Sequence, residues 1–251
     1  MSNHSWGPNG QWRTMAIRML NRLPDSYRVL IIGSTGTIGS AFQRACQSDP
    51  RCAYVGALSR SSMTPLILES EESVAAAAEA MRANGPFHLI LDATGALTID
   101  GQGPEKRLAQ LSASTLSRAF QINAIGRGLV LKYFIPLLAP KERAIFAVMS
   151  ARVGSIEDNH LGGWYGYRAS KAAGNMLLQT AAIESHRTRP LAVFAALQPG
   201  TVVSKLSAPF QSGHHTLQAE ASVAGLLRTL DGLEPKGRAW FVDYDGQEIP
   251  W

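Results

Sequence analysis

The chain has 251 residues, of which 45% are hydrophobic and 17% charged, and this composition excludes an intrinsically disordered chain. Two cysteines are too few for a disulfide-bonded scaffold or a thiolate metal site, which favours a reducing, cytoplasmic location. The net charge of +5 suits an anionic ligand but is too small to indicate nucleic acid, and the most apolar stretch, 128–139, is shorter than a membrane span.

The first 27 residues precede the earliest apolar β-type run, and we interpret them as an N-terminal extension. They contain three arginines and no acidic residue before Asp25, and Trp12–Leu23 is predicted to form a short amphipathic helix. A transit peptide fits the same pattern. The segment is short and poor in serine, which favours a plain extension.

From Arg28 onward, apolar runs alternate with helix-length segments, which predicts one α/β domain over 28–251: a Rossmann-like, doubly wound, mostly parallel sheet with helices on both faces. Seven strands are expected, over Arg28–Ile32, Ala53–Leu58, Thr64–Leu68, His88–Ala93, Ala144–Met149, Leu191–Ala196 and Ala239–Val242. Helices are expected over Gly39–Ser48, Glu71–Asn84, Ser112–Leu138, Tyr165–Arg187 and Ala219–Asp231.

The first predicted strand runs directly into a glycine-rich turn and then a helix. Gly33 allows the tight turn, Gly36 lets the backbone approach a pyrophosphate, and Gly39 lets the helix pack closely on the strand. A plain strand-to-helix turn would also accept three glycines, but the position after the first strand favours a dinucleotide site. The residues predicted to bind cofactor here are Gly33, Thr35, Gly36, Thr37, Ile38 and Gly39.

The residues after the second predicted strand bear on the choice between NAD(H) and NADP(H). Folds that prefer NAD usually carry an acidic residue there for the ribose 2′-hydroxyl. Between Gly33 and Glu69 the only acidic residue is Asp49, which precedes the strand and so lies at the wrong end of the sheet. The guanidinium of Arg60 suits a 2′-phosphate instead. NADP(H) is therefore favoured, and a solvated surface arginine is the alternative.

Tyr167 and Lys171 are four residues apart at the start of a predicted helix, so they share one helical face. An ammonium group beside a phenol lowers the pKa of the phenol and makes it a better acid or base at neutral pH. Tyr165 has no such partner, because Ala169 follows it by four. The spacing occurs by chance on many helices, and a catalytic interpretation needs support from other residues.

That support comes from polar residues at the carboxyl edge of the predicted sheet, where open α/β folds bind ligands. Ser150 ends the fifth predicted strand, and Asn123 lies within a long helical segment, where its amide could interrupt the backbone ladder and hold a water molecule. Two further segments would line the same edge, Asp92-Ala93-Thr94-Gly95 and Gln198-Pro199-Gly200-Thr201.

Together these residues resemble the short-chain dehydrogenase/reductase family over 28–251, and segments 150–156, 163–171 and 241–251 are similar to its C-factor-like subgroup. The resemblance implies a catalytic tetrad of Asn123, Ser150, Tyr167 and Lys171. It also implies cofactor contacts, beyond the glycine turn and Arg60, from Ala93, Thr94, Gly95, Asn123, Tyr167, Lys171, Pro199, Gly200, Thr201 and Val202.

Three features depart from the main branch of that family. The glycine spacing is Gly-x-x-Gly-x-x-Gly rather than Gly-x-x-x-Gly-x-Gly, and Asp92-Ala93-Thr94-Gly95 replaces Asn-Asn-Ala-Gly. Aligning Gly154 places Ala151 where the catalytic serine usually stands. Ser150 or Ser155 must then supply the hydroxyl, and we prefer Ser150 because it ends the strand.

The resemblance implies hydride transfer between NADP(H) and a small-molecule carbonyl or alcohol. Ser150 would bind the carbonyl oxygen and Tyr167 would donate the proton. Lys171 would lower the pKa of Tyr167 and bind the nicotinamide ribose, while Asn123 would hold a water molecule in a proton relay. A substrate lid is expected near 204–218, containing Pro209, Phe210, His214 and His215; the histidine pair has no third ligand, so no metal site is predicted.

Two other function classes stay open. A dinucleotide-binding regulator or signalling protein without turnover would explain the unusual glycine spacing and Ala151. An epimerase or dehydratase shares that spacing and the Tyr-x-x-x-Lys pair, but such enzymes usually append a substrate domain. Family members often pair through the helices that correspond to 112–138 and 165–187, and both a monomer and a homodimer fit this chain. No nucleic-acid or membrane partner is expected.

Overall fold

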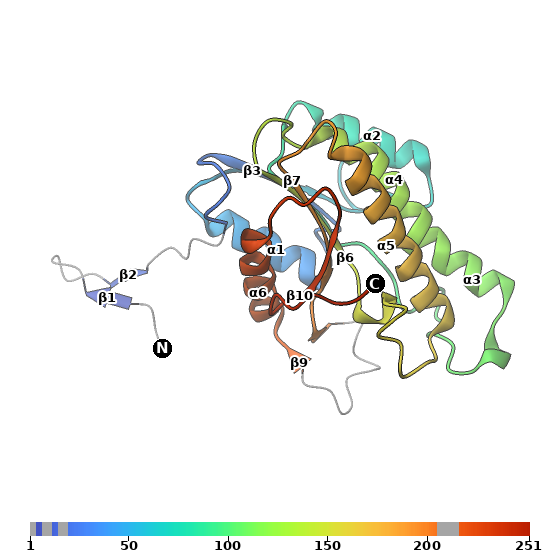
Figure 1. Cartoon of the computed structure of the whole chain (residues 1–251). Coiled ribbons are helices and arrows are strands. Elements are labelled where there is room, and N and C mark those ends of the chain that lie inside the picture. Colours follow the sequence, from blue (N-terminus) through green and yellow to red (C-terminus); the bar gives the residue numbers. More distant parts are fainter. Residues whose placement is uncertain (1–3, 7–11, 15–19, 205–215) are drawn as a thin grey trace.

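Apolar runs of four to seven residues form a central parallel sheet. The computed structural model describes residues 4–6, 12–14, 20–204 and 216–251. The strands of the sheet are β3 (Tyr27–Ile32), β4 (Cys52–Leu58), β5 (Leu89–Asp92), β6 (Ala144–Met149), β7 (Ala192–Gln198) and β10 (Trp240–Asp243). Their order is β10-β7-β6-β5-β3-β4, with every neighbouring pair parallel; Figure 1 labels β3, β6, β7 and β10 among them. This confirms the Rossmann-like α/β class.

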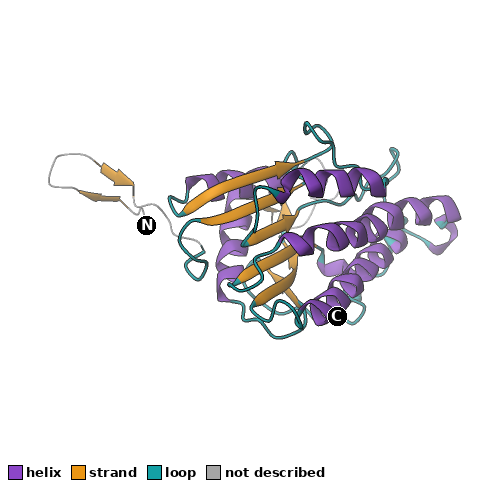
Figure 2. Ribbon diagram, turned by 90° about the horizontal axis from the view of Figure 1, so that it is seen from above, coloured by secondary structure: helices purple, strands orange, loops and turns teal. Residues whose placement is uncertain are grey.

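Helices cover both faces of the sheet, because successive residues of each strand point to opposite sides. In β3, Val29 and Ile31 pack toward one apolar cluster, and Leu30 and Ile32 toward the other. The first face carries α1 (Thr37–Ser48) and α6 (Ala219–Gly232). The second carries α2 (Glu71–Arg82), α4 (Gly126–Phe134) and α5 (Tyr165–Ser185), as Figure 2 shows.

The predicted helix 112–138 is present but interrupted. It consists of α3 (Ala113–Phe120), a π-helical turn η2 (Gln121–Ile125), α4 and a short 3₁₀ turn η3 (Ile135–Leu137). Such π-helical turns inside α-helices are frequent at functional sites. Two further 3₁₀ turns are η1 (Leu108–Gln110) and η4 (Arg152–Gly154).

One predicted strand was wrong, so the sheet has six strands rather than seven. Thr64–Leu68 is a loop that buries Leu66 and Leu68 without pairing to a neighbouring strand. Pro65 has no N–H for a ladder. The backbone is held instead by Ser73, whose Oγ donates to the Pro65 carbonyl at 2.7 Å and accepts from the Ile67 amide at 3.0 Å.

The N-terminal helix over Trp12–Leu23 was also wrong where the structure describes it. Residues 12–14 form β2 (Trp12–Thr14), which pairs antiparallel with β1 (His4–Trp6), and residues 20–24 form turns. The arginine-rich N-terminal segment thus contains two paired strands rather than the predicted helix. Residues 15–19 lie outside the described part of the chain.

The connections place the site at the carboxyl ends of the strands. The chain leaves β3 toward β4 on one side, and β5 lies on the other side of β3, which makes β3/β5 the switch point at which such sheets bind ligands. After β7, the short strands β8 (Thr201–Val202) and β9 (Thr216–Leu217) pair in parallel. Pro209, Phe210, His214 and His215 of the predicted lid lie outside the described residues. Among the described helices, none is both long and apolar enough to cross a membrane.

Candidate active site

The glycine turn has the geometry of an anion cradle. Gly33 has a φ of +83°, and its amide donates to the Leu58 carbonyl at 2.8 Å, which ties the turn to the end of β4. A Cβ on Gly39 would lie 2.3 Å from the Gly33 carbonyl oxygen, so only glycine fits there. Gly36 precedes α1 and offers no side-chain cap, which leaves the first-turn amides free to face an anion. These residues fit the pyrophosphate of a dinucleotide.

Arg60 lies two residues beyond the end of β4, close to that turn. Its side chain is exposed and forms no ion pair with any residue in the described part of the chain. Ser59, beside it, is buried, and its Oγ lies 3.1 Å from Ser61 Oγ. Arg60 is thus exposed near the glycine turn, and its recognition of a 2′-phosphate stays a prediction.

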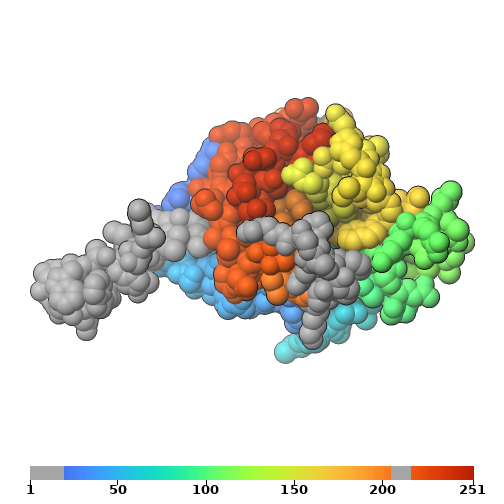
Figure 3. All heavy atoms as spheres, turned by 90° about the horizontal axis from the view of Figure 1, so that it is seen from below, coloured from blue at the N-terminus to red at the C-terminus, as the bar shows by residue number. Residues whose placement is uncertain are grey.

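A cavity of about 570 Å³ opens at the carboxyl edge of the sheet. Figure 3 shows this side of the molecule, with the segment after β6 in yellow and the segment after β7 in orange. Eleven of the predicted site residues line the cavity: Ile38, Ala93, Thr94, Gly95, Ser150, Tyr167, Lys171, Pro199, Gly200, Thr201 and Val202. The other predicted residues do not line it: Gly33, Thr35, Gly36, Thr37, Gly39, Arg60 and Asn123.

Asn123 lies in the π-helical turn, buried behind the cavity wall. Its side-chain amide makes two hydrogen bonds of 2.9 Å with the backbone of Ala96, one to the amide and one to the carbonyl. A Cβ on Gly95 would lie 2.8 Å from Lys171 Nζ and 3.2 Å from Asn123 Oδ1. The bare backbone of Gly95 therefore lets both side chains approach it closely. A water-holding role for Asn123 stays a prediction.

The two candidate serines differ in position. Ser150 lines the cavity, and its hydroxyl donates to Asn175 Oδ1 at 2.7 Å. Ser155 is held elsewhere: its Oγ accepts from the Asp158 amide at 2.9 Å and donates to the Trp251 carbonyl at 3.4 Å. Of the two serines, Ser150 is the one at the cavity.

Tyr167 and Lys171 share one face of α5, with Lys171 Nζ 5.6 Å from the centre of the tyrosine ring. Burial raises the pKa of Tyr167 to about 12 and lowers the pKa of Lys171 to about 7. That Lys171 lowers the pKa of Tyr167 stays a prediction; in the cofactor-free protein Lys171 has the lower pKa of the two. The charge of Arg127 lowers the pKa of Tyr167 and so opposes the larger effect of burial.

Comparison with known proteins decides the family. The short-chain dehydrogenase family model matches residues 28–214. The chain belongs to this family. It is therefore an NAD(P)-dependent oxidoreductase, as the motifs predicted.

Two relatives agree with that assignment, and a solved structure shares the fold. The C-signal protein of Myxococcus xanthus is 37% identical over 145 residues, covering 57% of this chain and 83% of that protein. A 1-hydroxy-2-glutathionyl-2-methyl-3-butene dehydrogenase of Rhodococcus is 30% identical over 185 residues, covering 72% and 76%. NADPH-bound carbonyl reductase from chicken fatty liver has the same fold, with a TM-score of 0.76 at 22% identity over 89% of this chain and 98% of that one.

Sequence reasoning missed a buried arginine of this short-chain dehydrogenase. Arg127, on α4, is 1% exposed, and its Nε lies 3.4 Å from Asp92 Oδ2. Its Nη2 donates to the Met149 carbonyl at 2.6 Å, and Lys171 Nζ donates to the same oxygen at 3.1 Å. A signal existed: a charged residue inside an apolar helical stretch, four residues after Asn123 and so on the same face.

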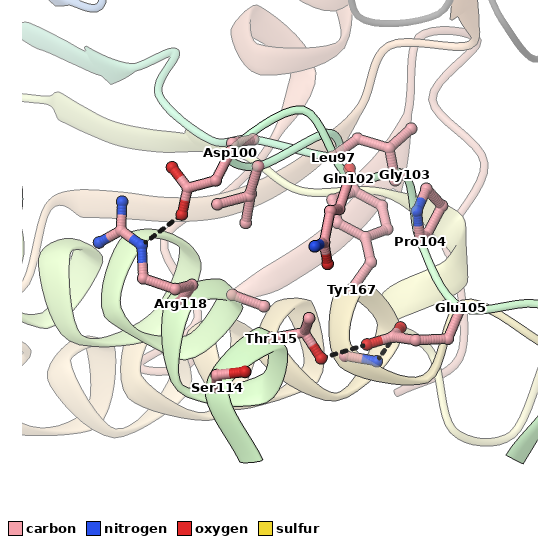
Figure 4. A pocket seen from close by; sticks show the side chains of 14 residues that line it. Leu97, Asp100, Gln102, Gly103, Pro104, Glu105, Ser114, Thr115, Arg118 and Tyr167 are labelled. Atoms are coloured by element: carbon pink, nitrogen blue, oxygen red, sulfur yellow. Dashed lines mark hydrogen bonds and ion pairs between the residues drawn. The ribbon is translucent and has the colours of Figure 1, made fainter. Parts of the chain in front are cut away.

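A second cavity lies on the other side of Tyr167. It has a volume of about 140 Å³ and is bordered by the loop 96–105, α3 and the start of α5, with Tyr167 and Leu97 shared between both cavities (Figure 4). The Glu105 carboxylate accepts from the Gly166 amide at 3.0 Å. Because Trp164 gives α5 no side-chain cap, Glu105 caps the helix that carries Tyr167.

Proposed function

We propose that the protein is an NADP(H)-dependent reductase that transfers hydride between the nicotinamide and a small-molecule carbonyl or alcohol. The observation that carries the proposal is the meeting of Ser150, Tyr167 and Lys171 at one cavity, beside a glycine turn with free helix amides. When bound, the nicotinamide supplies or accepts the hydride.

The side chains at the cavity would handle the oxygen and its proton. Ser150 would hydrogen-bond the carbonyl oxygen. A 180° rotation of the Asn175 amide would present Nδ2 to Ser150 Oγ, and the hydroxyl hydrogen would then be free to donate. Tyr167 would give its phenolic proton to the developing alkoxide. Lys171, with the lower pKa of the pair, would return a proton to the phenolate.

Tyr167→Phe tests the reaction, and Tyr165→Phe provides a matched control on the same helix. NADPH oxidation with a panel of aldehydes and ketones should fall by at least about 100-fold in Tyr167→Phe, as expected for loss of a general acid, and stay unchanged in Tyr165→Phe. Equal rates in the two variants would exclude Tyr167 as the acid. NADPH binding without turnover of any carbonyl would favour a regulatory role, which the name of the relative C-signal supports.

The preference for NADP(H) rests on Arg60. Replacing Arg60 by Ala should weaken NADPH binding about 10- to 100-fold through loss of a charge-assisted contact, with NADH binding unchanged. Dissociation constants from nicotinamide fluorescence measure both. Arg44→Ala removes an exposed arginine on the outer side of α1 and should affect neither cofactor. Equal losses for NADPH and NADH in Arg60→Ala would contradict the preference.

We also propose a homodimer that pairs through α4 and α5. Met176 and Ile183 on α5 are exposed by 65% and 51%, and Ile125, which directly precedes α4, is exposed by 50%. Light scattering should give twice the chain mass for the wild type and a single chain mass for Met176→Asp. A single mass for both would contradict pairing. The cytoplasmic location stays a prediction from the cysteine content.

A further inference from the structure

The chain contains a buried arginine–aspartate pair directly behind the proposed catalytic lysine. Arg127 and Asp92 are 1% and 0% exposed. Within the described part of the chain, Arg127 Nε, Arg127 Nη1 and Asp92 Oδ2 have no hydrogen-bond partner apart from the 3.4 Å ion pair itself. Removing two charges from water without replacing their hydrogen bonds destabilises a fold. A pair of this kind contributes little to stability, which points to a functional reason for it.

The pair is nevertheless held in a defined place. Asp92 ends β5, and its Oδ1 accepts from the amide of Thr94 at 2.9 Å and also from the Thr94 hydroxyl. Gly174 on α5 makes room for Arg127, because a Cβ there would lie 3.3 Å from both Arg127 Cδ and Nη1. Four elements thus fix the guanidinium: α4 carries it, β5 pairs with it, β6 accepts its hydrogen bond at the Met149 carbonyl, and α5 accommodates it.

Lys171 and Arg127 donate hydrogen bonds to the same carbonyl oxygen. The Met149 carbonyl accepts from both Lys171 Nζ and Arg127 Nη2, so two cationic groups share one acceptor in a buried site. Among the described residues, the charged and titratable groups that face Lys171 are Arg127 from α4, Asp92 from β5 and Tyr167 on its own helix, and β6 presents the Met149 carbonyl.

We propose that Arg127 is a positioning residue that provides a permanent positive charge beside Lys171, with Asp92 moderating it, so that Lys171 can release a proton without leaving the site uncharged. An arginine does not titrate in the physiological range. Its charge disfavours a second cation at the same carbonyl and favours the phenolate of Tyr167. The proposal rests on the proposed function, since it assigns Lys171 the return of a proton to Tyr167.

The direction of each effect follows from the charges. Burial lowers the pKa of Lys171 most, Arg127 lowers it further, and Asp92 raises it, with a result of about 7. The proton transfer balances: Lys171 loses one proton to the Tyr167 phenolate, becomes a neutral amine, and is reprotonated by solvent. Because the pKa of Lys171 is below that of Tyr167, this transfer is favourable.

Two opposite substitutions test the proposal. Arg127→Met should move the titration midpoint of Lys171 to higher pH, and Asp92→Asn should move it to lower pH. Each shift should be about one pH unit or more, because a buried charge in contact with the lysine is removed. The midpoint is measured on the cofactor-free protein from the 13Cε shifts of labelled lysine, with the Lys171 signal assigned by its loss in Lys171→Met. This readout does not depend on turnover, so it can fail or succeed independently of the reductase proposal.

Further variants keep the test decisive. If Arg127→Met does not fold, the double variant D92N/R127M avoids leaving Asp92 as an unpaired buried charge, and its midpoint should lie above that of Asp92→Asn. Arg127→Lys supplies only a titratable charge, so its midpoint should lie between those of the wild type and Arg127→Met. Arg44→Met makes the same change of net charge at a distant exposed pair and should leave it unmoved. Midpoints that shift in the same direction in Arg127→Met and Asp92→Asn, or that are equal in D92N/R127M and Asp92→Asn, would overturn the proposal.

If carbonyl reduction is found, its pH profile should move with the lysine midpoint. The limb assigned to Lys171 should shift toward alkaline pH in Arg127→Met and toward acid pH in Asp92→Asn. A purely structural role would lower the rate at all pH values without moving the limb. That result would also overturn the proposal.

Discussion

Two arginine–aspartate pairs lie at opposite ends of the sheet, one with a partly exposed arginine and one fully buried, and they are built differently. At the amino end, Arg51 pairs with Asp49 at 3.3 Å, and at the carboxyl end Arg127 pairs with Asp92 at 3.4 Å. The Asp49 carboxylate also accepts from the Tyr27 hydroxyl and the Arg51 amide, and Arg51 Nη2 donates to the Leu20 carbonyl at 2.7 Å. In the first pair a single atom, Arg51 Nε, has no hydrogen-bond partner among the described residues, against three atoms in the second.

The difference separates a structural pair from a functional one. Hydrogen bonds from several segments compensate the desolvation of Arg51 and Asp49, and they hold the chain before β3 against the loop before β4. Arg127 and Asp92 have few such bonds, but they adjoin a titratable lysine. An arginine–aspartate pair can thus serve stability or electrostatics. The two roles differ in how many polar atoms of the pair have a hydrogen-bond partner.

The largest effect is expected from breaking the structural pair. Arg51→Met should lower the free energy of unfolding by about 3 kcal/mol or more, because it leaves the buried Asp49 carboxylate without its cation. Urea denaturation measures this. Arg44→Met, which breaks an exposed pair with Glu220, should lower it by less than about 1 kcal/mol. Equal losses in the two variants would remove the basis for calling the Arg51 pair structural.

A smaller effect should appear when each pair is removed entirely. The double variant D49N/R51M should lose about 2 kcal/mol, because the carbonyls of Leu20 and Leu23 lose their donors. D92N/R127M should be within about 1 kcal/mol of the wild type, since replacing a poorly bonded buried pair is often neutral or stabilising. The two double variants are compared by urea denaturation at one pH. The reverse order of stability would contradict the distinction between the pairs.

The sequence predicted the parts of the site that depend on local patterns. Short motifs in the sequence reveal the glycine turn, the Tyr167–Lys171 spacing and the strand end at Ser150. The alternation of apolar runs located all six strands that form the sheet. Thr64–Leu68 was misjudged because its apolar residues serve a buried loop as well as they would a strand. The Arg127–Asp92 pair was not found, because it joins residues on α4 and β5 whose contact depends on how α4 packs on the sheet. Glu105 capping α5 from 61 residues away is a tertiary contact of the same kind.

The smallest effect, counted per pH unit, is a change of stability with pH. It arises from Lys171, which lies beside the Arg127–Asp92 pair and not beside the Arg51–Asp49 pair. The pKa of Lys171 is about 7 in the folded protein and near 10.4 in an unfolded chain. Between these values the unfolded state binds more protons, so the burial of Lys171 is least favourable below pH 7 and this penalty is relieved as the pH rises. Relative to Lys171→Met, the free energy of unfolding should therefore increase from pH 7 to 9 by about 1 kcal/mol per pH unit.

Urea denaturation of both proteins across that range measures the slope, and Lys132→Met is the control because it removes an exposed lysine that keeps its proton throughout. Parallel curves for the wild type and Lys171→Met would mean that Lys171 keeps its proton in the folded state. Arg127 would then lie beside a permanent ammonium, and the electrostatic role that distinguishes its pair from the Arg51 pair would be lost. The wild-type curve should be steeper than that of Lys171→Met. If the curve of Arg127→Met were instead parallel to that of the double variant R127M/K171M, the slope would be due to the guanidinium rather than to burial alone.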